Sequence, residues 1–220
     1  MTIEKFSTAV FAGENLSCRR GGRGVFTGLS FRVASGEALV LRGPNGSGKT
    51  TLLRLMAGLA RMASGTLTWN SGDIRDDGPA HGARLGFAGH LDSVKPALTV
   101  RENLSFWAEL RGARPADVTQ ALETFAVRHL ANLPGRVLSA GQKHRVALAR
   151  LLLGNAQLWL LDEPANTLDD TALNALRSVL NAHVQRGGMA VIASHGETLL
   201  PQALSLDLHR FAPKSVMEAA

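Results

Sequence analysis

A glycine-rich segment in the first quarter of the chain has the residue types that bind phosphate. Its spacing, G-x-x-x-x-G-K-[ST], follows a short apolar run at 38–41 and opens a helix-like segment at 48–58. Successive glycines let backbone N–H groups curl around an anion, and the N-terminus of the helix adds its free amides. Chance produces this pattern in fewer than ~1% of chains of this length, so a turn with an incidental lysine is the weaker interpretation. The segment comprises Gly43, Pro44, Asn45, Gly46, Ser47, Gly48, Lys49 and Thr50, with Thr51 directly after it.

The last two residues of this segment indicate a nucleotide bound with Mg²⁺. Lys49 would reach the β- and γ-phosphates, and Thr50 would place its hydroxyl on the metal. Two carboxylates, Asp162 and Glu163, stand where another apolar run ends. In an open α/β sheet that edge faces the ligand crevice. Asp162 is then a partner for Mg²⁺, directly or through water, and Glu163 is placed to orient or deprotonate the attacking water.

A third segment begins a helix near residue 139. Ser139 and Gln142 have the S-x-x-Q spacing of a capping box, in which each side chain bonds the backbone N–H of the other residue. A well-capped helix explains these two residues. It does not explain Gly141 between them, nor the coincidence with a phosphate loop and an acidic pair in one chain.

Segment 138–142, Leu-Ser-Ala-Gly-Gln, resembles the LSGGQ signature of ABC ATPases, with alanine in place of the first glycine. It ends 20 residues before Asp162 (162 − 142). In that family the signature of one subunit caps the γ-phosphate held by the phosphate loop of its partner. The resemblance therefore implies ATP and Mg²⁺ as cofactors and a homodimer around two ATP molecules. The signature residues that would contact phosphate are Ser139, Gly141 and Gln142.

Further elements of the family follow in order. Segment 166–169, Asn-Thr-Leu-Asp, resembles the D-loop, which lies along the dimer seam. His195 follows an apolar run and resembles the switch histidine that contacts the γ-phosphate. The resemblance covers about residues 8 to 210. Because Lys49 and both acids are also in place, a non-catalytic regulator is disfavoured.

Besides the alanine in the signature, two positions depart from the family pattern. ABC ATPases place a glutamine at the end of a strand, where it touches Mg²⁺ and the attacking water, whereas here the predicted strand 84–89 is followed by His90. A histidine protonated near pH 6–7 would repel Mg²⁺, so we expect activity to fall on mild acidification more steeply than in a His90→Gln variant. The adenine-stacking aromatic near residue 20 is also missing. Arg20 is the candidate, since a guanidinium can stack on a base, and Phe11 is either an alternative or a core strand residue.

Segment 89–107 and the basic cluster after the signature closely resemble one branch, the ATP-binding subunit of the bacterial haem exporter of cytochrome c maturation. This implies integral membrane subunits as partners, a peripheral position on the cytoplasmic face of the inner membrane, and release of a haem-loaded periplasmic chaperone driven by ATP hydrolysis. An apolar docking groove is expected around residues 90–112. The alternative is the ATPase of another exporter, for peptides, lipids or drugs, because the ATP-site motifs are shared. A soluble ABC ATPase acting on ribosomes or DNA usually carries tandem domains or a coiled-coil insertion, and neither is recognisable here.

The elements that must position these residues alternate between strand and helix. Continuous apolar runs at 38–41, 158–161 and 189–193 predict strands buried on both faces, as in a parallel sheet. A helix is expected over 170–186, capped by Asp169 or Asp170. Short antiparallel strands are expected over 7–35 and 65–70, and helices over 99–130, the second of them opened by Pro115.

These elements predict an α/β fold with a P-loop NTPase (RecA-like) core, an antiparallel β subdomain and an α-helical insertion. We expect one ABC ATP-binding domain over residues 1–212, with a flexible tail at 213–220. The core and β subdomain would take about residues 1–90 and 155–212. The helical subdomain would take about residues 91–154.

Composition narrows the remaining classes of partner. A net charge of +6 is compatible with nucleic acid or an anionic membrane, but the basic residues are scattered and no aromatics alternate with them, so we expect no nucleic acid. The single cysteine, Cys18, permits no internal disulfide and suits a reducing cytosol. The N-terminus lacks a signal-peptide pattern, and no apolar run approaches the ~20 residues that span a bilayer. The seven histidines are scattered, so we expect surface positions for those outside the nucleotide site and no direct haem binding.

Overall fold

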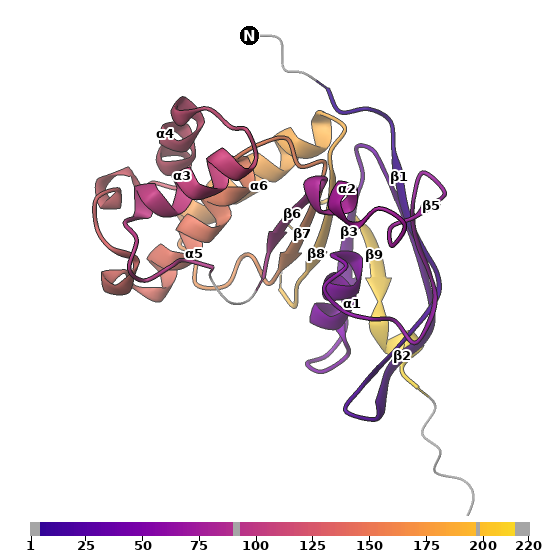
Figure 1. Ribbon diagram of the computed structural model, residues 1–220. Helices are drawn as coiled ribbons and strands as arrows, with labels where there is room; N and C mark the ends of the chain where they lie inside the picture. The colour runs from indigo at the N-terminus through magenta and orange to yellow at the C-terminus, as the bar shows by residue number, and fades with distance from the viewer. Residues whose placement is uncertain (1–4, 90–92, 197–198, 214–220) are drawn as a thin grey trace, which may run out of the picture.

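The computed structural model describes residues 5–89, 93–196 and 199–213 of the 220-residue chain. Two β-sheets stand on either side of helices α1 and α2, and helices α3 to α6 form a separate layer beyond the larger sheet (Figure 1). The strands are β1 Val10–Arg20, β2 Arg23–Ala34, β3 Ala38–Arg42, β4 Ser64–Trp69, β5 Gly72–Asp73, β6 Leu85–Ala88, β7 Leu158–Asp162, β8 Met189–Ala193 and β9 Leu204–Asp207. The helices are α1 Lys49–Met56, α2 Gly78–Ala83, α3 Val100–Leu110, α4 Pro115–Thr124, α5 Ala140–Ala149 and α6 Asp170–Gln185, with short 3-10 helices at Arg128–Leu130, Gly135–Val137, Arg150–Leu152 and Leu208–Phe211.

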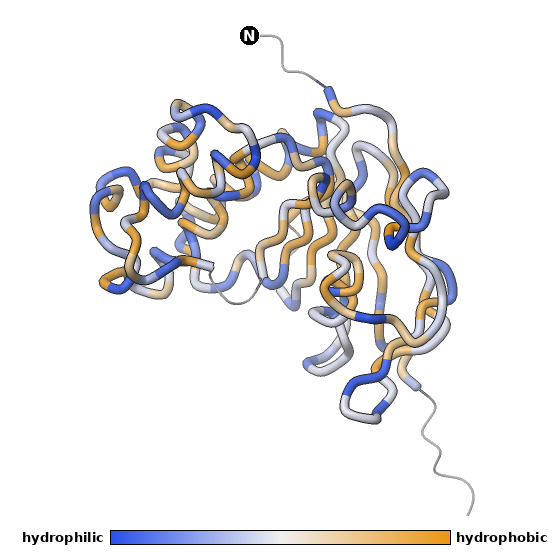
Figure 2. The backbone as a smooth tube through the Cα atoms, viewed as in Figure 1, coloured by the Kyte–Doolittle hydropathy of each residue, from blue (hydrophilic) through white to orange (hydrophobic). Residues whose placement is uncertain are grey.

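The larger sheet is parallel, with the strand order β6-β7-β8-β3-β9. Every residue of β7 and β8 is buried, and the central strands are hydrophobic along their length (Figure 2). Because side chains alternate across a strand, this sheet serves two cores. Leu158 and Leu160 pack with α1 and the antiparallel sheet, whereas Trp159 and Leu161 pack with the helical layer. The expected parallel α/β core is confirmed.

The smaller sheet is antiparallel, with the order β2-β1-β4-β5. Its inner face covers α1, and the fully buried Phe11, Phe26 and Leu67 belong to that shared core. The long hairpin of β1 and β2 ends in the turn between Arg20 and Arg23, next to the phosphate loop. This hairpin therefore brings the N-terminal part of the chain to the nucleotide site.

The helical layer is attached to the edge strand β6 by two arginines. Arg111, which follows α3, donates from Nη2 to the Leu85 carbonyl at 2.9 Å, and Arg150, which follows α5, donates to the Phe87 carbonyl at 2.5 Å. Both guanidinium groups also face the ring of Trp107, at 5.7 Å and 4.6 Å from its centroid. An edge strand has backbone carbonyls that no neighbouring strand satisfies, and here two cations from the helical layer occupy them.

Most expected elements are confirmed, including Asp169 as the cap of α6 and Pro115 at the first turn of α4. The sequence did not predict α2 or β9. The expectation of surface histidines is wrong for three of them, because His81, His144 and His183 are buried and bond backbone carbonyls.

Candidate nucleotide site

A pocket of about 560 Å³ opens at the carboxyl ends of β3, β7 and β8. It gathers residues from four separate segments: the β1–β2 hairpin, the phosphate loop, the end of β7 and the end of β8. Its lining comprises Arg20, Val25, Asn45, Gly46, Gly48, Lys49, Thr50, Thr51, Asp162, Glu163, Asn166 and His195. Ligands of open α/β sheets bind at this edge of the strands.

The phosphate loop presents the start of α1 to this pocket. Gly48 is the residue before the helix and has φ 99°, a conformation that favours glycine. A Cβ at this position would lie 2.5 Å from Cγ1 of Val25, so the loop could not approach β2 as closely with another residue. No described side chain caps α1, and its first turn holds no acidic residue. The free amides of the helix therefore remain available to an anion.

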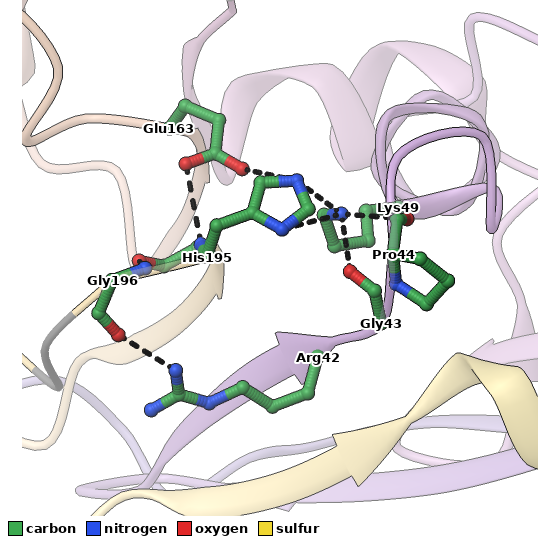
Figure 3. A network of polar contacts seen from close by, with 8 residues as sticks. Arg42, Gly43, Pro44, Lys49, Glu163, His195 and Gly196 are labelled. Atoms are coloured by element: carbon green, nitrogen blue, oxygen red, sulfur yellow. Dashed lines mark hydrogen bonds and ion pairs between the residues drawn. The ribbon is translucent and has the colours of Figure 1, made fainter.

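Lys49 lies at the centre of the polar network in Figure 3. Its ammonium donates to the carbonyls of Gly43 and Pro44, at 2.9 and 3.2 Å, and lies 2.7 Å from Nε2 of His195. Burial lowers the pKa of Lys49, while the charges of Glu163 and then Asp162 oppose that shift. A lysine ammonium can only donate, so Nε2 of His195 accepts from it.

The acidic pair ends β7 and turns back over β8. Asp162 is 3% exposed and is the last residue of the strand. Glu163 has φ 52°, a left-handed conformation that costs a non-glycine residue of order 1 kcal/mol and is characteristic of functional sites. Its backbone N–H donates to the Ala193 carbonyl at 2.9 Å, and its Oε2 accepts from the backbone N–H of His195 at 3.4 Å. Glu163 is therefore fixed to the end of β8 by its backbone and to His195 by its side chain.

The residues present fit Mg²⁺ held jointly with phosphate. No group of three or more His, Cys, Asp or Glu side chains that could hold a metal occurs among the described residues. Nucleotide-bound Mg²⁺ needs only one or two protein ligands, because phosphates and water supply the rest. Asp162 and Thr50 line the same pocket. Oε1 of Glu163 is buried and lies 3.3 Å from Nε2 of His195 (Figure 3). Because that nitrogen accepts from Lys49, it does not also donate to Glu163, and within the described residues Oε1 is left without a hydrogen-bond donor, which suits a carboxylate that receives a water.

A tether joins the phosphate-loop strand to the segment after His195. Arg42, the last residue of β3, donates from Nη1 to the Gly196 carbonyl at 2.7 Å (Figure 3). This bond links the strand before the phosphate loop to the segment after β8. The two segments of the chain that carry Lys49 and His195 are therefore held together.

The other predicted site residues have different positions. Arg20 lines the pocket, whereas Phe11 is fully buried in the core and cannot stack on a base. His90 lies outside the described residues. The sequence did not predict two of the pocket residues as nucleotide contacts: Val25, which only the β1–β2 register brings here, and Asn166, which only the turn after Glu163 brings here.

The signature residues lie at the start of α5 and do not line this pocket. The capping box is formed as expected: the Ser139 backbone N–H donates to Oε1 of Gln142 at 2.9 Å, and the Gln142 N–H donates to Oγ of Ser139 at 3.2 Å. Gly141 follows the first residue of the helix and is half-buried. These three residues therefore lie outside the pocket that contains the chain's own phosphate loop.

The family model of the ABC transporter matches residues 26–166, well over half of the chain and from the second strand to the loop after Glu163. The chain belongs to the ABC transporter family. It is 52% identical to the cytochrome c biogenesis ATP-binding export protein CcmA of Rhodospirillum rubrum, over 93% of this chain and 88% of that protein. It is 49% identical to the CcmA protein of the same description from Paramagnetospirillum magneticum, over 94% of this chain and 97% of that protein.

Among solved structures, a putative ABC transporter ATP-binding protein from Pyrococcus furiosus has a TM-score of 0.80 at 25% identity, covering 92% of this chain and 99% of that one. The expected family and its α/β fold are thus confirmed, and the chain is an ATP-binding member of it. Within the described residues no helix is long and apolar enough to cross a membrane.

Proposed function

We propose that this ABC protein hydrolyses ATP, with Mg²⁺, as the motor subunit of a membrane export complex. The observation that supports this best is the convergence of Lys49, Asp162, Glu163 and His195 on one pocket from three separate strand ends. The division into a core with a β subdomain and a helical subdomain at about 91–154 is part of the proposal.

The residues that line this pocket have distinct proposed roles in ATP hydrolysis. The loop amides and Lys49 bind and orient the phosphates. Asp162 and Thr50 would hold Mg²⁺, which would neutralise charge on the phosphate oxygens. Glu163 accepts a proton from the attacking water, and His195 leaves Lys49 and contacts the γ-phosphate. Arg20 stacks on the adenine.

The position of the start of α5 outside the pocket supports a proposed homodimer. Ser139, Gly141 and Gln142 begin a helix whose start lies at the surface, where Ser139 is exposed and the capping box takes the Gln142 N–H. A helix N-terminus attracts anions, so this one contributes to the phosphates held by a second copy. Two ATP molecules would then lie between two identical subunits.

The proposed membrane partners dock on a groove within the predicted segment 90–112. A largely apolar groove of about 350 Å³ includes Val94, Leu98, Phe106 and Trp107, and Phe106 is 43% exposed. Lys95 lies with its Nζ 4.4 Å from the Phe106 ring centroid and gives the groove one cation. Such a surface suits an amphipathic helix of an integral membrane subunit. The chain would then sit peripherally on the cytoplasmic face of the bacterial inner membrane.

The similarity to proteins described as cytochrome c biogenesis export proteins supports a specific cargo system. We propose that ATP hydrolysis by this chain drives haem export, or release of a haem-loaded chaperone, during cytochrome c assembly. The chain itself does not bind haem in this proposal. Its buried histidines bond backbone carbonyls and are not available as ligands.

The decisive test concerns the role of Glu163 as the general base. A Glu163→Gln variant keeps the shape of the side chain but cannot accept a proton, so kcat for ATP hydrolysis should fall about 100-fold or more. Its affinity for ATP should stay near that of the wild type, whereas a Lys49→Met variant should lose ATP binding. Steady-state phosphate release and nucleotide-binding titrations separate the two effects. Hydrolysis at the wild-type rate by Glu163→Gln would refute the role of this carboxylate.

A further inference from the structure

The loop that follows Glu163 is held in an unfavourable backbone conformation. This β7–α6 loop, residues 163–169, joins the last strand residue Asp162 to the cap of α6. Both Glu163, with φ 52°, and Thr167, with φ 63°, are non-glycine residues in the left-handed region. A strained turn persists only where its surroundings determine it, so contacts from elsewhere must hold this loop.

Those contacts come from helix α5. The His144 side chain is 7% exposed, and its Nε2 lies 3.0 Å from the carbonyl oxygen of Pro164, the residue directly after Glu163. A carbonyl oxygen only accepts, so this nitrogen carries a proton and donates. One residue further along α5, Arg145 donates from Nη2 to Oδ2 of Asp169 at 2.6 Å, at the far end of the loop.

The helix and the loop also approach closely between these two bonds. A Cβ added to Gly141 would lie 3.2 Å from the carbonyl oxygen of Thr167. Asp169 uses its other oxygen to cap α6, accepting from the Ala172 N–H at 2.9 Å. The loop is thus attached to α5 at both ends and packed against it in the middle, while its first residue reaches into the pocket.

We propose that His144 and Arg145 are positioning residues for Glu163, which fix the β7–α6 loop to α5. The inference rests on the proposed function, in which Glu163 is the base. Helix α5 also begins with Ser139. The same helix would therefore contact the ATP of the partner subunit and position Glu163 of its own chain.

Two substitutions at His144 separate a donated hydrogen bond from simple packing. His144→Gln places an amide N–H where Nε2 lies and preserves the donation to Pro164. His144→Leu fills the space without a donor. We expect His144→Leu to lower kcat roughly 10- to 100-fold, the range for a misplaced catalytic group, with KM for ATP within about 2-fold of wild type. His144→Gln should stay within about 3-fold of wild type in both constants.

A second readout does not depend on hydrolysis. Hydrogen exchange of the full-length chain should be faster in residues 163–169 of His144→Leu than in His144→Gln or the wild type, because the loop loses an attachment. Arg145→Met, at a half-buried position, should give the same local increase if His144→Leu does not fold, and Arg145→Lys should give a smaller one.

Equal kcat values for His144→Gln and His144→Leu, together with unchanged exchange in the loop, would overturn the proposal. Fast exchange in His144→Gln equal to that of His144→Leu would also overturn it, since size alone would then matter. A wild-type chain that binds ATP without hydrolysing it would contradict the proposed function instead, and the exchange comparison would still decide whether α5 holds the loop.

Discussion

At the scale of single residues, His183 is the side chain whose protonation state the fold constrains most. Its ring stacks on Trp159 with centroids 3.8 Å apart and planes 8° apart. Nε2 lies 3.2 Å from the carbonyls of both Gln157 and Met189, and the residue is 4% exposed. Burial lowers the pKa of His183 to about 4, although both carbonyls favour the protonated ring. The neutral imidazole is therefore part of the native structure.

This burial predicts acid-sensitive stability. The unfolded chain binds a proton at His183 below about pH 6.5 while the folded chain does not, so the free energy of unfolding should fall from about pH 6.5 down to about 4. Above that range the contribution is constant. At about 1.4 kcal/mol per pKa unit, the fall of the pKa from 6.5 to about 4 corresponds to a loss of at most about 3.5 kcal/mol.

Urea unfolding of the wild type and of His183→Gln at several pH values measures this contribution. The glutamine keeps a donor for the two carbonyls and does not titrate, so the difference in unfolding free energy between the two proteins should change over the range from about 6.5 to 4. A constant difference across that range would show that His183 is not the group responsible.

Individual site residues could be predicted from sequence where their neighbours in the chain define them. Lys49 stands inside a continuous loop motif, and Glu163 follows an apolar run that can only be a buried strand. Val25 and His144 carried no such local signal. Val25 reaches the pocket through the pairing of β1 with β2. His144 was expected at the surface, like the other histidines outside the nucleotide site, but it is buried against the Pro164 carbonyl.

At the scale of elements, the attachment of the helical layer depends on cations that cap the edge of β6. Arg111 bonds the Leu85 carbonyl and stacks against Trp107, and burial lowers the pKa of its guanidinium. A side chain at this position must bond a carbonyl and face an aromatic ring at the same time. The planar guanidinium of arginine can do both, whereas the compact ammonium of lysine is less suited to it. Replacing it with an apolar residue leaves a strand carbonyl without its donor.

Arg111→Met should therefore destabilise the protein by about 2 kcal/mol, the range for a lost hydrogen bond to a charged group. Arg101→Met, an exposed position on the same helix, serves as the control and should change stability by less than about 0.5 kcal/mol. Urea titration followed by tryptophan fluorescence reports both, since Trp107 lies against Arg111. Equal stabilities for the two variants would show that the β6 edge does not need this cap.

Elements with a strong internal pattern could be predicted, and elements defined by their partners could not. The strands of the parallel core are uninterrupted apolar runs, and α6 has both a cap and an apolar face. Helix α2 spans only Gly78–Ala83 and contains two glycines and a proline; the Asp77 cap and the bond from His81 to the Met56 carbonyl hold it. Strand β9 is half exposed and gains its structure from pairing with β3.

At the scale of the whole molecule, the two segments proposed to bind phosphate lie in different parts of one chain. The phosphate loop and the acidic pair share a pocket, whereas the start of α5 belongs to the helical layer beyond the parallel sheet (Figure 1). The resemblance of segment 138–142 to the ABC signature implies this division from the sequence. The contacts between α5 and the loop after Glu163 join residues that are about 20 positions apart in the sequence, namely His144 with Pro164 and Arg145 with Asp169. No local sequence pattern predicts them.

If the start of α5 faces the phosphate of a second subunit, a negative charge introduced at position 139 should prevent ATP-dependent dimer formation. In a Glu163→Gln background, ATP should accumulate between two subunits and produce a dimer that light scattering detects. Asparagine and aspartate cap a helix as well as serine does, so Ser139→Asn and Ser139→Asp should both preserve α5 and the unfolding midpoint. The aspartate, however, would place a carboxylate against the partner's γ-phosphate, where like charges repel. The Glu163→Gln/Ser139→Asn double variant should therefore still dimerise with ATP, whereas Glu163→Gln/Ser139→Asp should stay monomeric. If the aspartate variant formed the dimer as readily, the start of α5 would not face a phosphate, and the two-subunit site would have to be abandoned.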